Sequence, residues 1–128
     1  MMQSLFRSFK HSRDGLRVAW AEDHSFRVSA AQFIVGLVVA TALFASHEIG
    51  ILTWLLLIGA TMPILVVETI NTSIEAVTDK ASPERHPLAK KAKDIGSAAV
   101  LLTRIYAIIC WAVVLYMAAQ PQTVIPAN

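Results

Sequence analysis

Three long apolar blocks constrain this chain more than any other feature of its sequence. The block from Gly50 to Val67 holds eighteen consecutive residues without a charge, close to the length that a helix needs to cross a lipid bilayer. Two similar blocks flank it, and the mean hydropathy of +0.56 and apolar fraction of 55% reflect all three. Because backbone groups in lipid must be paired within their own segment, this pattern predicts an all-α integral membrane protein.

The 128 residues leave room for a single domain. We expect three membrane-spanning helices, at about 28–46, 51–70 and 95–119. An amphipathic helix at about 2–25 should lie on the membrane surface, with Gly15 as a candidate break. The second span should continue as helix through Asp79, and a basic loop at 80–93 should lead into the third.

Lysine and arginine predict the orientation of the spans. The N-terminal segment and the 80–93 loop each carry five of these residues, whereas the turn at 47–50 carries none. We therefore expect the N-terminus and the 80–93 loop to be cytoplasmic and the C-terminus to be outside. The net charge of +2 is small, and no nucleic-acid partner is expected. The polar, basic N-terminus does not resemble a cleavable signal peptide.

A polar stripe follows the apolar residues of the second span. At about 100° per residue, one helix face would carry Glu68, Asn71, Thr72, Glu75 and Asp79. The stripe begins where the helix should leave the hydrocarbon. An ionisable residue at that depth is costly unless it faces protein, water or a ligand, so the stripe is a candidate functional site.

Carboxylates at a cytoplasmic membrane interface, close to lysines and arginines, indicate a magnesium-bound phosphate site. Mg²⁺ prefers a few carboxylate oxygens together with water and substrate phosphates. Glu75, with Glu22 or Asp23, could supply those oxygens, while Lys93 could pair with phosphate. Glu68 has the depth of a lipid hydroxyl and suits a general base. No P-loop and no protein-kinase signature occurs in the sequence.

Two motifs resemble those of a known family, the small prokaryotic diacylglycerol kinases, which also includes the undecaprenol kinases. The first motif is Glu68-x-x-Asn71-Thr72-x-Ile74-Glu75-x-Val77-x-Asp79, and the second is Ala92-Lys93-Asp94-x-Gly96-Ser97-Ala98-Ala99-Val100. The resemblance covers nearly the whole chain. It implies a homotrimer in the bacterial inner membrane, with active sites shared between subunits, that uses MgATP to phosphorylate a membrane lipid.

The resemblance also implies a role for each matching residue. Glu68 would be the general base and contact the lipid, and Asn71 would orient the reacting groups. Glu75 would bind magnesium together with Asp23, where the family usually has glutamate, so Glu22 is an alternative. Nucleotide contacts are implied for Lys93, Asp94, Glu84, Arg85, His86 and, more weakly, His11. Ser97 and Arg27 would line the lipid end of the site.

Three functions remain open from the sequence. The first is an ATP-dependent lipid kinase that converts diacylglycerol to phosphatidic acid, with undecaprenol as the alternative acceptor. The second is a small proton-coupled transporter subunit with Glu68 as the carrier carboxylate, although such a carboxylate is expected nearer the middle of the membrane. The third is a membrane assembly factor without catalytic activity. Arg104, about ten residues into the third span, has no obvious partner in the sequence.

Overall fold

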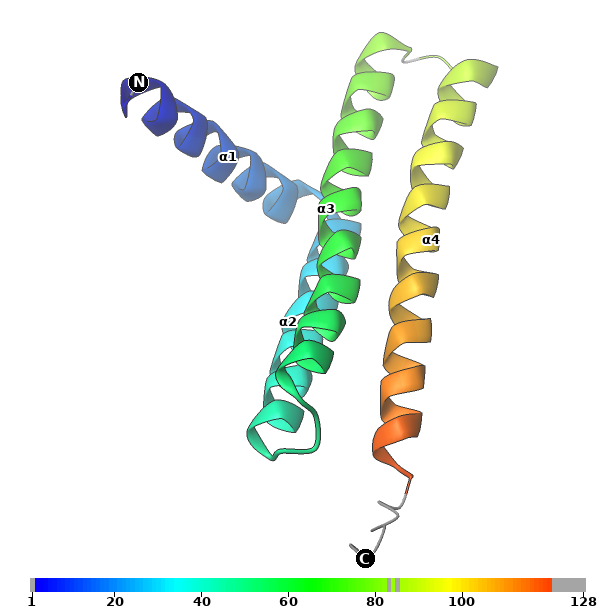
Figure 1. Cartoon of the computed structure of the whole chain (residues 1–128). Helices are drawn as coiled ribbons and strands as arrows, with labels where there is room; N and C mark the ends of the chain where they lie inside the picture. Colours follow the sequence, from blue (N-terminus) through cyan, green and yellow to red (C-terminus); the bar gives the residue numbers. More distant parts are fainter. Residues whose placement is uncertain (1, 83, 85, 121–128) are drawn as a thin grey trace, which may run out of the picture.

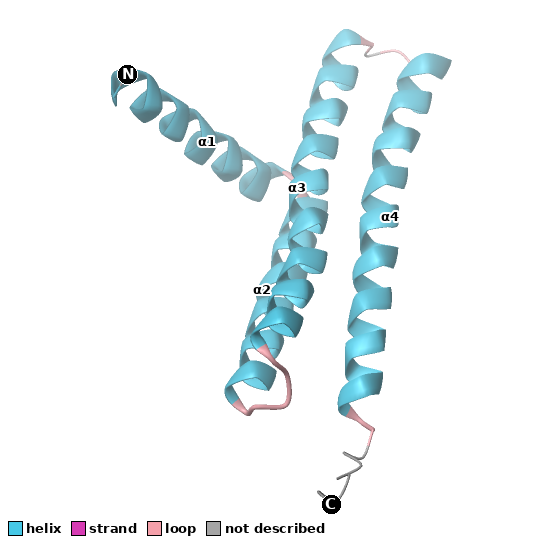
Figure 2. Cartoon of the chain, viewed as in Figure 1, coloured by secondary structure: helices cyan, strands magenta, loops and turns pink. Residues whose placement is uncertain are grey.

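The computed structural model describes residues 2–82, 84 and 86–120. In this part of the chain four helices follow one another: α1 (Met2–Glu22), α2 (His24–Ala45), α3 (Ile51–Ala81) and α4 (Pro87–Ala118) (Figures 1 and 2). Three of them, α2, α3 and α4, are long and apolar enough to cross a membrane. The prediction of an all-helical membrane protein with three spans and a separate N-terminal helix is confirmed.

The three long helices form a bundle in which α3 packs against both α2 and α4. A tight turn at 46–50 reverses the chain between α2 and α3, and a short connection joins α3 to α4 at the opposite end (Figure 1). Helix α1 leaves the bundle at an angle and packs against α2. The C-terminal end of α4 lies at the same end of the bundle as the 46–50 turn.

Three details of the helices differ from the approximate bounds expected from the sequence. The N-terminal helix ends at Glu22 and not at 25, because Asp23 caps the next helix with its side chain. It also runs through Gly15 without a break. Helix α4 already begins at Pro87, since proline at the first helical position has a suitable φ and needs no hydrogen-bond acceptor. The predicted extension of the second span is confirmed, because α3 runs to Ala81 as one helix.

Close packing of small and large apolar residues holds together the end of the bundle near the 46–50 turn. Ala40 and Leu57 are fully buried there, together with Val114, and Trp54 and Trp111 pack against this cluster. Elsewhere the long helices expose many large apolar side chains. Lipid or a second subunit would cover such surfaces in a membrane protein.

The register between α3 and α4 positions the candidate functional side chains. Asp79 lies eleven positions after Glu68 on α3, and Arg104 lies eleven positions after Lys93 on α4. Each interval is about three helical turns. Seven more residues along each helix, about two turns, reach Thr61 and Trp111. The antiparallel helices therefore make contact through three pairs in one register: Asp79–Lys93, Glu68–Arg104 and Thr61–Trp111.

Candidate active site

A polar cavity of about 470 Å³ lies between α3 and α4, at the level where the polar stripe begins. Its lining includes five of the residues predicted from the sequence: Glu68, Asn71, Glu75, Asp94 and Ser97. Ser25 from α2 and Arg104 from α4 also contribute. The first three residues meet because spacings of three and four place them on one helix face. The structure thus brings together side chains from both sequence motifs.

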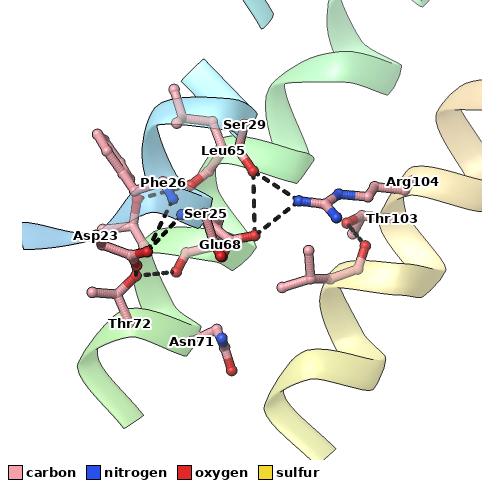
Figure 3. A network of polar contacts seen from close by, with 12 residues as sticks. Asp23, Ser25, Phe26, Ser29, Leu65, Glu68, Asn71, Thr72, Thr103 and Arg104 are labelled. Carbon is pink, nitrogen blue, oxygen red and sulfur yellow. Dashed lines mark hydrogen bonds and ion pairs between the residues drawn. The ribbon is translucent and has the colours of Figure 1, made fainter. Parts of the chain in front are cut away.

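Glu68 is the most buried charged residue of this cavity, with a side chain only 3% exposed. Its Oε2 accepts a hydrogen bond from Ser29 Oγ at 3.2 Å and another from Arg104 Nη2 at 3.3 Å (Figure 3). Arg104 Nη2 also donates to Ser29 Oγ at 3.1 Å. The carboxylate is thereby fixed by α2 and α4 together, and its charge is compensated.

Asn71 lies one turn further along α3, between Glu68 and Glu75 in the sequence. Its Nδ2 donates to Glu75 Oε1 at 3.1 Å, while its Oδ1 is buried without a hydrogen-bond partner among the described residues. That oxygen lies against Gly96, where an added Cβ would overlap it. Glycine at position 96 therefore provides the space that the Asn71 side chain occupies.

The oxygen atoms of this cavity suit a hard divalent cation. Glu75 and Asp94 offer carboxylates, and Asn71 offers an amide carbonyl that lacks a partner. Within the described residues no group of three or more His, Cys, Asp or Glu side chains could hold a metal. Mg²⁺ does not need such a cage, because it is usually held by one or two carboxylates plus waters and substrate phosphates. The residues present fit that mode of binding.

A second cavity, of about 620 Å³, lies at the end of the bundle where α3 meets α4. It contains four of the residues predicted to contact nucleotide: Glu84, His86, Lys93 and Asp94. Lys93 Nζ donates to Asp79 Oδ1 at 2.7 Å, and Lys90 pairs with Asp94 one turn away. These charged groups are largely exposed to water. Asp94 lines both cavities, so the two are adjacent.

Several predicted site residues lie outside these cavities. His11 is exposed on α1, and Arg27 Nη1 donates to the carbonyls of Trp20 and Ala21 at the corner between α1 and α2. Glu22 is exposed at the end of α1. Arg85 lies outside the described residues.

Asp23 has a structural role at the start of α2. Its Oδ1 accepts hydrogen bonds from the backbone N–H groups of Ser25 and Phe26 at 2.8 and 3.3 Å, and its Oδ2 accepts one from the Thr72 hydroxyl. Burial acts to raise the pKa of Asp23, but these hydrogen bonds and the nearby Arg27 charge outweigh it and lower the pKa below its usual value. Asp23 therefore carries a negative charge close to the stripe.

An apolar groove of about 710 Å³ adjoins the polar cavity and extends along α2 and α4. Its lining is dominated by aliphatic and aromatic side chains, among them Val35, Val39, Ile108 and Trp111. Arg104 lines both the groove and the polar cavity. The groove has the apolar lining that a hydrocarbon chain requires, and it meets the polar cavity at Arg104.

Sequence reasoning missed the roles of Ser29 and Arg104. Ser29 is fully buried, and Arg104 has its Nε buried without a partner in the described part of the chain. A signal was present, because Arg104 follows Lys93 by the same interval that separates Glu68 from Asp79. Pairing Asp79 with Lys93 across two antiparallel helices would therefore have predicted Glu68 as the partner of Arg104.

Comparison with known proteins gives a consistent result. The sequence profile of a family described as "Prokaryotic diacylglycerol kinase" matches residues 10–115. A diacylglycerol kinase of Escherichia coli K12 is 37% identical over 112 residues, 88% of this chain and 88% of the relative. One from Helicobacter pylori strain 26695 is 41% identical over 107 residues, 84% of this chain and 80% of the relative. One from Haemophilus influenzae is 30% identical over 113 residues, 88% and 92% respectively.

Proposed function

The chain belongs to the prokaryotic diacylglycerol kinase family, and we propose that it transfers the γ-phosphate of ATP to the free hydroxyl of diacylglycerol, forming phosphatidic acid. The family is one of lipid kinases, so ATP and a divalent metal belong to the reaction. The choice of diacylglycerol over undecaprenol rests on the relatives, each of which is named a diacylglycerol kinase.

One structural observation carries this proposal. A cavity lined by carboxylates and an amide adjoins an apolar groove. Arg104 lines both, and it is paired with Glu68 on the wall of the polar cavity. A membrane lipid has the same two parts, a hydrocarbon chain and a hydroxyl. With the chain in the groove, its hydroxyl would reach the Glu68 carboxylate. A transporter carboxylate would have no need of the adjoining phosphate-compatible cavity.

The chemistry follows from the positions of the carboxylates. Glu68 accepts the proton of the lipid hydroxyl as that oxygen forms a bond to the γ-phosphorus of ATP. The bond between the γ-phosphorus and the bridging oxygen of ATP breaks, and ADP leaves. Asn71 orients Glu75 through its amide hydrogen bond. Magnesium, held by Glu75 with Asp23 as a second candidate carboxylate, would neutralise phosphate charge when ATP is bound.

The cavity at the junction of α3 and α4 would hold the nucleotide. Lys93 is partly exposed and paired with the exposed Asp79, so it can exchange that partner for a phosphate at little cost. Glu84, His86 and Asp94 line the same cavity and are proposed contacts to the nucleotide. Arg85 is proposed from the sequence motif alone.

We further propose a homotrimer in the bacterial inner membrane, with the N-terminus in the cytoplasm. Exposed apolar side chains such as Leu102 and Ile109 on α4 offer surface for contacts between subunits. Helix α1 projects away from its own bundle (Figure 1). His11 on α1 could then contribute to the site of a neighbouring subunit, while Ser97 and Arg27 are proposed to line the lipid end of the site.

Purified protein in mixed micelles provides the decisive assay. With Mg²⁺ and radiolabelled ATP, we expect label in phosphatidic acid when diacylglycerol is supplied, and at least tenfold less lipid phosphate with undecaprenol. The reverse ratio would identify an undecaprenol kinase. Absence of transfer to either lipid, together with proton flux in proteoliposomes, would contradict the kinase assignment and support a transporter.

A further inference from the structure

Arg104 is the charged residue that the proposed reaction leaves without a role. It lies three helical turns beyond Lys93 in a helix that is apolar enough to span a membrane. A cation at this depth is costly and is usually paired inside the protein. Its partners here come from two other helices, Ser29 on α2 and Glu68 on α3.

The three side chains form a closed ring of hydrogen bonds. Arg104 Nη2 donates to Ser29 Oγ at 3.1 Å and to Glu68 Oε2 at 3.3 Å, and Ser29 Oγ donates to the same Oε2 at 3.2 Å (Figure 3). In such a ring each hydrogen bond polarises the next. The donors converge on one oxygen of the carboxylate.

The other oxygen of Glu68 is left available. None of the hydrogen bonds among the described residues involves Glu68 Oε1, whereas Oε2 accepts from both donors. Glu68 itself lines the polar cavity. Because a carboxylate group is planar, holding Oε2 in place on a buried side chain also sets the direction of Oε1.

We propose that Arg104 and Ser29 are positioning residues, which hold Glu68 by Oε2 so that Oε1 receives the proton of the lipid hydroxyl. This inference rests on the proposed kinase function and on the assignment of Glu68 as the base. The proton moves from the lipid oxygen to Oε1 as the oxygen–phosphorus bond forms and ADP departs. Arg104 and Ser29 neither gain nor lose a proton.

The test compares steady-state kinetics of five variants with the wild type. For Arg104→Gln we expect kcat to fall roughly 10- to 100-fold, because a misplaced reacting group can cost about 100-fold. Ser29→Ala should lower kcat by roughly 3- to 10-fold. The KM for ATP should stay within about twofold in both, since the nucleotide cavity is separate. Arg104→Lys should recover part of the loss, because lysine retains a charged N–H donor.

Thr103→Val serves as the matched control. Thr103 neighbours Arg104 on α4, but its hydroxyl donates only to the backbone carbonyl of Val100. We expect wild-type kcat and KM. Thermal unfolding and gel filtration of every variant show the folded fraction, to which kcat is normalised.

The double variant Ser29→Ala with Arg104→Gln separates positioning from unrelated damage. Because both residues act on the same oxygen, their combined effect on kcat should be clearly smaller than the product of the single effects. Multiplicative effects, or a kcat for Arg104→Gln within threefold of wild type, would overturn the proposal. If Arg104→Gln does not fold, Ser29→Ala and Arg104→Lys decide it: wild-type kcat in both would overturn it. An inactive wild type would instead refute the kinase function.

Discussion

The two ends of the polar stripe on α3 hold their charges in different ways. At the inner end Glu68 is buried and receives hydrogen bonds from two other helices, and its side chain is 3% exposed. At the outer end Asp79 and Lys93 form a single pair whose side chains are 66% and 36% exposed. A buried charge cannot change partner without a large desolvation cost, whereas an exposed one can. The inner end is therefore suited to a fixed base, and the outer end to a ligand that comes and goes.

The largest expected effect comes from a substitution at the inner end of the stripe. Glu68→Gln keeps the shape of the side chain but removes the proton acceptor, so kcat should fall by roughly 10²- to 10⁴-fold. Radiolabelled lipid formation in mixed micelles measures this. Asp14→Asn is the control, because Asp14 is exposed on α1 and pairs only with its neighbour Arg13. Activity of Glu68→Gln within fivefold of wild type would contradict the assignment of the base.

A variant at the opposite end of the bundle separates stability from chemistry. Leu57 is fully buried in the cluster near the 46–50 turn. Leu57→Ala should destabilise the protein by about 2–5 kcal/mol, since it leaves a cavity. The kcat of the remaining folded protein should be unchanged, because the cluster is remote from Glu68. Thermal unfolding alongside the lipid assay tests both statements, and a specific loss of kcat would show that the two ends are coupled.

A substitution at the outer end of the stripe should change the affinity for the nucleotide. Lys93→Ala should raise the KM for ATP by roughly 10- to 100-fold, the value of a hydrogen bond to a charged group. Its thermal stability should hardly change, because the Asp79 pair is exposed to water. Lys91→Ala is the matched control, as Lys91 is an exposed residue two positions away that lines neither cavity. Equal effects of the two substitutions would indicate only a general electrostatic attraction.

The smallest expected effect on activity concerns Asp23, which lies between the two ends. Asparagine caps helices about as well as aspartate, but it loses the charge and the hydrogen bond from Thr72, so Asp23→Asn should lower stability by about 1 kcal/mol at pH 7. The Mg²⁺ concentration for half-maximal activity should also rise, because a negative charge is lost. Activity titrated with Mg²⁺ measures this. If the Mg²⁺ concentration for half-maximal activity is unchanged, Asp23 acts only as a helix cap.

The same residue gives a pH dependence with a defined sign. Because its folded-state pKa is lowered from 3.8, the charged form of Asp23 stabilises the protein above about that pH. The stabilisation is lost as the pH falls through the folded-state pKa, when the carboxylate becomes protonated. The Asp23→Asn variant should not show this loss of stability as the pH falls.

The sequence by itself determined the membrane class, the three spans and the residues of the polar stripe. Hydrocarbon imposes a minimum length of apolar helix, and helical periodicity places residues such as Glu68, Asn71 and Glu75 on one face. These constraints are local to one segment and can be read along the chain. The family motifs added roles to the same residues, and the structure brings five of them into one cavity.

Only the tertiary structure decided the partners of the buried charges. Ser29, Glu68 and Arg104 lie on three different helices, and their contact depends on the register of α3 against α4 and of α2 against α3. A shift of one turn would place Glu68 beside another residue, and no local pattern fixes that shift. The register follows from close packing along the whole interface, such as Asn71 against Gly96 and Thr61 against Trp111. For this reason the sequence could suggest Glu68 as the base, whereas only the packing of the helices showed which residues hold its side chain.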